Sequence, residues 1–216
     1  MRKYDLAIFD MDGTILDSLT DIADCLNFIL TKHGFATHEA RQVRLFVGNG
    51  VRKLIECALP KGTEPAVFEA VYNDFVVYYK AHCAEKTAPY AGIPEMLAAL
   101  RAAGMKTAVY PNKIDAAVKS LCEKYFPGLF DFALGQRDGV PTKPAPDGVY
   151  DVLQALGVPA ERAVYVGDSE VDVKTAINAG THGLFVSYGF REVETLREAG
   201  GKTIADTVEE LKAFLL

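Results

Sequence analysis

The chain has 216 residues, half of them hydrophobic, which is enough for one core domain with a subdomain. Its formal net charge of −6 and the absence of a lysine or arginine run argue against nucleic-acid or membrane-surface partners, so a small-molecule partner is expected. The four cysteines form no CxxC pair and fit neither a zinc site nor a small disulfide scaffold. The N-terminal residues resemble neither a signal peptide nor a membrane span, so we expect a cytoplasmic protein.

Short apolar runs that end in turn signals predict buried parallel strands. The first is YDLAIF, and runs of the same kind follow as KTAVY, DFALG, RAVYVGD and HGLFVSYG. Between the later runs, helical spacing is found at residues 114–123, 146–156 and 170–179. Residues 90–216 therefore alternate strand and helix, which predicts βαβ crossovers and an α/β fold with a mostly parallel sheet.

Residues 17–88 interrupt this alternation. The stretch DSLTDIADCLNFILTKHGF has its apolar residues at helical spacing, and two further helical stretches follow at 48–59 and 64–86 without an intervening strand. We therefore predict a helical insertion after the first strand. Its expected hinges are Asp17 to Ser18 on one side and the segment TAPYAGIP on the other.

Acidic residues follow two of the predicted strands. Asp10 and Asp12 come after the first strand, and Asp168 and Asp172 come at and after the end of the strand in VYVGDSEVD. Two acids at a strand end can simply form a turn. In an open α/β sheet, however, ligands bind beyond the carboxyl ends of the strands, so both acidic pairs are expected in one cleft.

Converging carboxylates repel one another and require a cation. Mg²⁺ is the expected ion because it takes oxygen ligands and bridges to phosphate. Lys143, which lies between prolines in GVPTKPAPD, is a second candidate cation, with an exposed loop charge as the alternative. Such a site suits phosphoryl transfer to an aspartate, followed by hydrolysis of the acyl phosphate, with a second aspartate as general acid and base.

Four motifs occur in a fixed order: DMDGT, NK after a strand, KPAPD and GDSEVD. With the helical insertion between the first two, the chain resembles the haloacid dehalogenase superfamily, and within it the phosphoglycolate phosphatase-like branch. FVGNGVRKLI and PYAGIPEMLAALRAAG also look like that branch. The resemblance implies a Rossmann-like core, residues 1–16 and 89–216, with helices on both faces of its sheet, and a small helical cap at residues 17–88.

The resemblance also implies roles for individual residues. Asp10 would be the nucleophile and Asp12 the general acid and base, while Mg²⁺ would be held by Asp10, the Asp12 carbonyl and Asp168. Lys143 would neutralise the phosphoryl group, and Asp172 would support either a metal-bound water or Lys143. Dehalogenating members lack the second aspartate of DMDGT, so a phosphate ester is the expected substrate.

Further residues are assigned more loosely. Thr14 is expected to steady the Asp12 loop near the phosphate, and Gly48 to Gly50 to form a cap loop facing the site. Arg52 is a candidate for binding a substrate carboxylate, although a solvated helix face explains it equally well. The aromatic and apolar stripe within residues 68–79 is interpreted as cap core rather than as part of a ligand site.

Pro111 departs from the family pattern, in which a Ser or Thr hydroxyl before NK binds a phosphoryl oxygen. The fold tolerates proline just beyond the last ladder hydrogen bond of a strand. The loss of one donor would cost about 10²–10³ in rate if nothing replaced it. The backbone N–H of Asn112 and the hydroxyl of Thr142 are candidate replacements, so we expect an active but slower phosphatase.

The sequence is also compatible with alternatives to a small-phosphomonoester phosphatase. They are a catalytically impaired phosphate-binding relative, a sugar-phosphate phosphatase or mutase, and a pyrophosphatase. An aspartate-phosphorylated receiver is disfavoured by the chain length, by the helical insertion and by the position of Asp10 after the first strand. The sequence predicts no particular oligomeric state.

Overall fold

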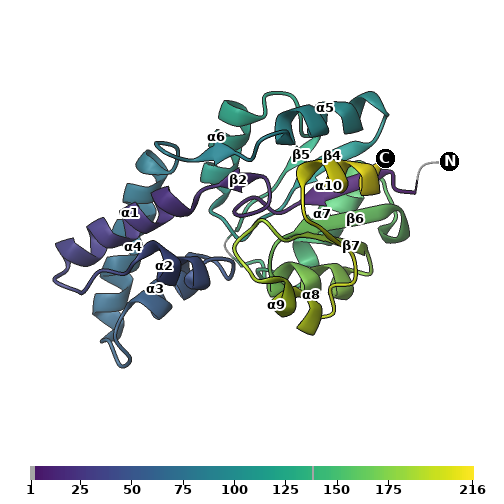
Figure 1. Ribbon diagram of the computed structural model, residues 1–216. Helices are drawn as coiled ribbons and strands as arrows, with labels where there is room; N and C mark the ends of the chain where they lie inside the picture. Colours follow the sequence, from purple (N-terminus) through teal and green to yellow (C-terminus); the bar gives the residue numbers. More distant parts are fainter. Residues whose placement is uncertain (1–2, 138) are drawn as a thin grey trace.

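A single parallel sheet forms the centre of the protein in the computed structural model, which describes residues 3–137 and 139–216 (Figure 1). The strand order is β5-β4-β1-β6-β7-β8, and neighbouring strands are parallel throughout. The strands are β1 (Leu6–Phe9), β4 (Lys106–Val109), β5 (Phe132–Ala133), β6 (Ala163–Gly167), β7 (His182–Val186) and β8 (Ile204–Ala205). The predicted α/β fold with a parallel sheet is confirmed, although the short strand β8 was not predicted.

The central strand shows why its sequence is apolar without alternation. All four residues of β1 are buried. Leu6 and Ile8 belong to one hydrophobic cluster, and Ala7 and Phe9 belong to the other. Successive side chains of a strand point to opposite faces, so a sheet covered on both faces needs apolar residues at every position.

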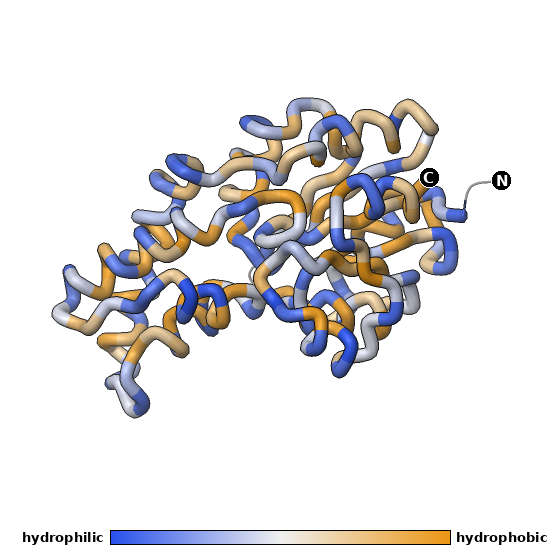
Figure 2. Tube along the Cα trace, in the orientation of Figure 1, coloured by the Kyte–Doolittle hydropathy of each residue, from blue (hydrophilic) through white to orange (hydrophobic). Residues whose placement is uncertain are grey.

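Helices cover both faces of the sheet. On one face, α5 (Ile93–Ala102), α6 (Asp115–Tyr125) and α10 (Val208–Leu215) contribute buried residues to the same cluster as Phe9. On the other face, α7 (Asp147–Leu156), α8 (Glu170–Ala179) and α9 (Val193–Glu198) pack in the cluster that holds Ile8. The helices expected at 114–123, 146–156 and 170–179 are confirmed as α6, α7 and α8. Figure 2 shows the strands as largely orange, hydrophobic segments, with blue, hydrophilic segments mainly at the periphery.

Four helices lie between the first two motifs of the chain and sit to one side of the sheet (Figure 1). They are α1 (Leu19–Lys32), α2 (Ala40–Phe46), α3 (Val51–Ala58) and α4 (Pro65–His82). Three of them occupy the helical stretches predicted from the sequence, whereas α2 was not predicted. None of the helices among the described residues is long and apolar enough to cross a membrane.

The chain enters and leaves this helical cap through two adjacent segments. β2 (Leu16–Asp17) pairs antiparallel with β3 (Ala88–Pro89). Just inside the cap, the buried carboxylate of Asp21 accepts hydrogen bonds from the backbone N–H groups of residues 85, 86 and 87, at 2.8 to 3.0 Å. The start of α1 is therefore tied to the segment that follows α4, and the two connections lie side by side.

Candidate functional site

The acidic residues predicted from the strand ends do meet. β1 pairs with β6 in a register that places Phe9 opposite Val166, and the backbone N–H of Asp10 donates to the Val166 carbonyl at 2.8 Å. Carboxylate oxygens of Asp10, Asp168 and Asp172 all lie within 4.8 Å of one another, and all three residues are buried. The first strand ends beside the sixth, so loops far apart in sequence contribute to one cluster.

Gly13 makes the turn after Asp12 possible. Its φ is +83°, and a Cβ atom there would lie 2.2 Å from Oδ2 of Asp168, so a side chain is excluded. The Asp168 carboxylate is held by the Phe190 backbone N–H at 2.6 Å and by the Thr14 hydroxyl at 3.2 Å. Thr14 was expected near the phosphate and the Asp12 loop, but the structure places its hydroxyl on Asp168.

Lys143 lies inside the acidic cluster rather than on the surface. Its Nζ is 2.9 Å from Asp10 and 2.7 Å from Asp172, and it donates to the Tyr165 hydroxyl at 2.9 Å. The Tyr165 hydroxyl donates in turn to the Tyr110 carbonyl at 2.7 Å. Tyr165 lies in a strand whose sequence is typical of a buried core strand, so its contact with Lys143 could not be predicted from the sequence.

Asp172 supports its neighbours through both oxygens. Oδ1 accepts from Lys143, and Oδ2 accepts from the Ser169 hydroxyl at 2.6 Å and from the backbone N–H groups of Asp168 and Ser169. Of the two roles considered for Asp172, the structure favours support of Lys143. It also leaves Asp10 and Asp168 as the members of the cluster with more freedom to bind a cation.

The cluster has an excess of negative charge. Burial, followed by repulsion from Asp172, raises the pKa of Asp10 well above its ordinary value and raises that of Asp168 to about 7. Burial alone would lower the pKa of Lys143, but the carboxylates of Asp10 and Asp172 raise it well above its usual range. One ammonium therefore pairs with two of the three buried carboxylates, and an additional cation would stabilise the charged forms of the cluster.

The available donors are of the type that Mg²⁺ prefers. All are oxygen atoms, and hard divalent cations bind carboxylates, carbonyls and water in preference to nitrogen or sulfur. The carboxylate of Asp12 is not among the group that lies within 4.8 Å, so this residue could contribute only its backbone carbonyl there.

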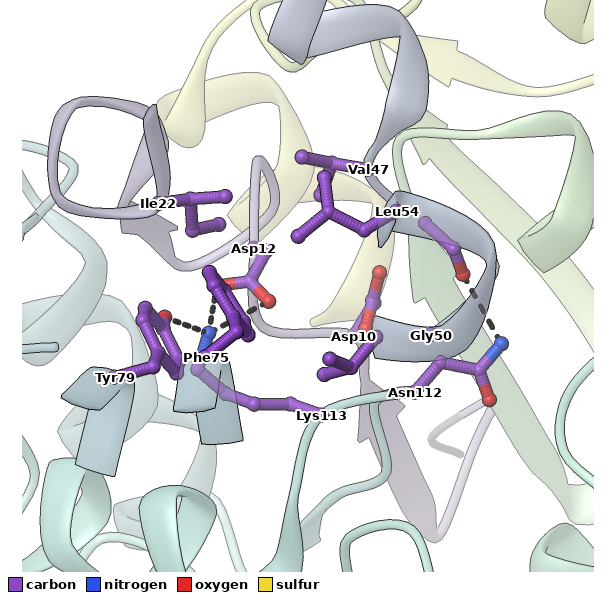
Figure 3. A pocket seen from close by; sticks show the side chains of 12 residues that line it. Asp10, Asp12, Ile22, Val47, Gly50, Leu54, Phe75, Tyr79, Asn112 and Lys113 are labelled. Atoms are coloured by element: carbon purple, nitrogen blue, oxygen red, sulfur yellow. Dashed lines mark hydrogen bonds and ion pairs between the residues drawn. The ribbon is translucent and has the colours of Figure 1, made fainter. Parts of the chain in front are cut away.

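The Asp12 carboxylate is instead held by a second lysine, Lys113, which was not among the predicted site residues. The Nζ of Lys113 lies 2.7 and 2.8 Å from the two Asp12 oxygens and donates to the Tyr79 hydroxyl of α4 at 2.6 Å (Figure 3). The Ser18 hydroxyl donates to the same carboxylate at 2.5 Å. Lys113 is the lysine of the NK motif, and that motif was the available signal.

A cavity opens between the cap and the carboxyl ends of the strands, with about 470 Å³ of empty space including its mouth. Cap residues form most of its wall and core residues form its floor (Figure 3). The lining residues are Asp10, Asp12, Ile22, Val47, Gly48, Gly50, Val51, Leu54, Phe75, Tyr79, Asn112 and Lys113. Phe75 and Tyr79 are buried in the hydrophobic core, as expected for the stripe within residues 68–79, and these two side chains also line the cavity.

Two core side chains fix the cap loop beside the cavity. The Asn112 amide donates to the carbonyls of Gly48 and Lys143, both at 3.0 Å, and its oxygen accepts from the Lys143 backbone N–H. Arg191, which is 7% exposed, donates to the Val47 carbonyl at 2.6 Å. The Asn112 side chain is thus occupied in joining loops. The backbone N–H of Asn112 has no acceptor among the described residues, so it is not occupied by another hydrogen bond.

Arg52, which was a candidate for binding a substrate carboxylate, lies away from this cavity. The Arg52 guanidinium pairs with Glu69 and stacks on the rings of Phe68 and Tyr72, and Arg52 is not among the lining residues. From the same helix, α3, Val51 and Leu54 do line the cavity. Arg52 therefore lies on the solvated face of α3.

Thr142 was considered as a source of the missing hydroxyl. It lines a separate, smaller pocket with Gln136, Arg137 and Pro141, and it does not line the cavity that contains Asp10. Asn112 lines both pockets. The structure thus gives no direct support to Thr142 as a substitute for the hydroxyl that Pro111 lacks.

Comparison with known proteins agrees with the motifs. Residues 7–186 match the family model described as haloacid dehalogenase-like hydrolase. The chain is 34% identical to the phosphoglycolate phosphatase of Caulobacter vibrioides over 194 residues, covering 87% of this chain and 82% of that protein. It is 30% identical to the N-acetylmuramic acid 6-phosphate phosphatase of Pseudomonas aeruginosa, covering 94% of this chain and 91% of that protein.

A solved structure of a candidate phosphoglycolate phosphatase from Lactobacillus delbrueckii subsp. bulgaricus superimposes with a TM-score of 0.93 and 37% identity. The superposition covers 100% of this chain and 99% of the other. The resemblance inferred from the four motifs is confirmed. The chain belongs to the haloacid dehalogenase-like hydrolase family.

Proposed function

We propose that the protein is a Mg²⁺-dependent phosphatase that hydrolyses a small phosphomonoester, 2-phosphoglycolate or a similar organic phosphate, through an aspartyl-phosphate intermediate. The observation that carries the proposal is the placement of Lys143, 2.9 Å from Asp10 and inside a cluster of three buried carboxylates. The phosphoglycolate phosphatase relatives, 34% identical in the Caulobacter vibrioides protein, support the same substrate class.

Asp10 is the nucleophile in this proposal. Its carboxylate attacks the phosphorus, the bond to the leaving oxygen breaks, and an acyl phosphate forms on Asp10. The Lys143 ammonium orients the carboxylate and neutralises charge on the transferring group. Bound Mg²⁺, held by Asp10, Asp168 and the Asp12 carbonyl, would further reduce the negative charge on the phosphoryl oxygens.

Asp12 is the general acid and base. It protonates the leaving oxygen in the first step and accepts a proton from water in the second, when water attacks the acyl phosphate and releases inorganic phosphate. This division of labour is supported by the separate surroundings of the two aspartates, since Asp10 contacts Lys143 and Asp12 contacts Lys113.

The cap, residues 17–88, closes over the core, residues 1–16 and 89–216, by bending near Ser18 and Pro89. Closure excludes water from the phosphoryl group during transfer. The antiparallel pair of β2 and β3 supports a hinge at this place, because it is the only pair of strands that joins cap to core among the described residues.

The deciding experiment is a hydrolysis screen with and without Mg²⁺. The panel contains 2-phosphoglycolate, N-acetylmuramic acid 6-phosphate, other sugar phosphates, p-nitrophenyl phosphate and pyrophosphate. We expect phosphate release from at least one monoester, loss of activity in excess EDTA and no activity in Asp10→Asn, which keeps the side-chain shape. Full activity in EDTA, or in the Asp10→Asn protein, would contradict the proposal.

Pro111 supports one competing function, a relative that binds phosphate without turnover. This alternative predicts that the protein binds inorganic phosphate in the presence of Mg²⁺ but releases none from the whole panel. A preference for pyrophosphate, or phosphate exchange between positions of a sugar phosphate, would instead identify a pyrophosphatase or a mutase.

A further inference from the structure

Lys113 connects Asp12, the proposed general acid and base, to helix α4 of the cap. Its own side chain is 3% exposed, and its ammonium contacts three oxygens, two of Asp12 and one of Tyr79. Figure 3 shows Lys113 extending along the floor of the cavity to reach both groups. A buried ammonium with this set of acceptors is fully engaged and is not a spare surface charge.

The position of Asp12 depends on these contacts. Asp10 and Asp12 are separated by a single residue and both line the cavity, yet only Asp10 belongs to the acidic cluster around Lys143. Lys113 holds both oxygens of Asp12, and Ser18 binds one of them at 2.5 Å. Because these contacts engage both oxygens, they restrict rotation of the Asp12 carboxylate and keep it apart from the cluster.

From this geometry we propose that Lys113 is a positioning residue, which holds the Asp12 carboxylate at the leaving-group side of the cavity, and that Tyr79 of the cap completes the arrangement. The proposal rests on the proposed function, because it assigns Lys113 to the acid and base of that reaction. It adds that α4 contributes to the proton-transfer geometry through a hydroxyl, and that Lys113 acts through Asp12 and not on the phosphoryl group.

The consequence is a dependence on the leaving group. An alkoxide leaves poorly unless it is protonated in the transition state, whereas p-nitrophenolate leaves without this help. A misplaced Asp12 should therefore slow the hydrolysis of alkyl phosphates far more than that of p-nitrophenyl phosphate. A residue that merely maintained the fold, or that bound the phosphoryl group, would affect both esters alike.

The test compares kcat and KM of wild type and Lys113→Met on the best alkyl phosphate of the panel and on p-nitrophenyl phosphate. We expect kcat on the alkyl phosphate to fall by about 10²-fold and kcat on p-nitrophenyl phosphate to fall by less than about tenfold. Lys86→Met is the matched control, because Lys86 is an exposed cap lysine that pairs with Asp24. It should leave both rates unchanged.

Two further variants keep the test decisive if Lys113→Met folds poorly. Tyr79→Phe retains the ring, which stacks on Phe75 at a centroid distance of 5.3 Å, and removes only the hydroxyl. It should shift the ratio of the two rates in the same direction by a smaller factor. In an Asp12→Asn background, adding Lys113→Met should reduce the remaining alkyl phosphatase rate by less than about threefold, because residues that act as a unit are not additive.

Equal losses on both esters, or an undiminished loss in the Asp12→Asn background, would overturn the role of Lys113 while leaving the proposed phosphatase intact. A wild-type protein that hydrolyses neither ester would overturn the proposed function and this inference with it. The two failures are therefore distinguished by the wild-type rates alone.

Discussion

Replacing Lys143 by Met should destabilise the folded protein as well as slow the reaction. Lys143 is 1% exposed on its side chain and is ion-paired to Asp10 and Asp172, which are 7% and 0% exposed. Methionine has a similar length but no charge, so the substitution leaves two buried carboxylates without their ammonium. Removing one partner of a buried pair typically costs about 3–5 kcal/mol.

This loss in the free energy of unfolding corresponds to a lower melting temperature. Unfolding entropies are about 2.1 cal/mol/K per residue, so for a chain of this size 1 kcal/mol corresponds to about 2.2 °C and the expected loss is about 7–11 °C. The loss should be larger at pH 8 than at pH 5, because at lower pH the orphaned carboxyl groups can take up protons. Excess Mg²⁺ should restore part of the stability at pH 8.

Thermal unfolding followed by circular dichroism measures these differences. The matched control is Lys124→Met, since Lys124 is exposed, donates to the Ala84 carbonyl at 2.6 Å, lies 4.9 Å from the centroid of the Tyr125 ring and does not contact the acidic cluster among the described residues. The control should stay within about 1 °C of wild type, as expected for a surface change below about 0.5 kcal/mol. A Lys143→Met protein that melts with the control at pH 8 would refute the argument that this lysine neutralises the cluster.

Three further predictions follow from the same geometry. Pro111→Ser should raise kcat, measured by phosphate release, by about tenfold with a smaller change in KM, because a hydroxyl in that place would stabilise the charge of the transition state. An unchanged kcat would show that another donor already binds the phosphoryl group there. Without metal, stability should fall as the pH rises from about 5 to about 7.5, because Asp168 binds its proton more tightly in the folded protein, with a pKa raised to about 7, than in the unfolded chain. Mg²⁺ should remove most of this fall and Asp168→Asn should reduce it, and a melting temperature that rises over this range would contradict the assignment. Arg52→Ala should change KM by less than about twofold for substrates with and without a carboxylate, because the Arg52 guanidinium pairs with Glu69 outside the cavity. A selective rise in KM for the carboxylate-bearing ester would instead show that Arg52 contributes to substrate binding.

The sheet and the acidic cluster could be predicted because each depends on local sequence. Buried parallel strands need apolar residues at every position, so β1 and β6 stand out without knowledge of their partners. Asp10 and Asp168 come directly after these strands, and the carboxyl ends of parallel strands lie at one edge of the sheet. Short, irregular pieces such as β8 and α2 carry too few residues for a period to be recognised.

The contacts of long polar side chains could not be predicted in this way. The partner of Lys113 on the cap depends on where α4 lies relative to the loop after β4, and no spacing in the sequence gives that position. The hydroxyl of Tyr165 likewise belongs to a strand that reads as core. Arg52 is a different case: the burial of Val51, Leu54, Ile55 and Ala58 defines one face of α3, and the helical period already places Arg52 off that face.

The strand order explains how one short motif can hold two aspartates in different surroundings. β1 lies between β4 and β6, so the loop that follows it is flanked by loops from both neighbours. From the β4 side comes Lys113, which pairs with Asp12, and from the β6 side comes Asp168, which lies beside Asp10. The two aspartates of the motif therefore have separate counter-charges, Lys143 for Asp10 and Lys113 for Asp12.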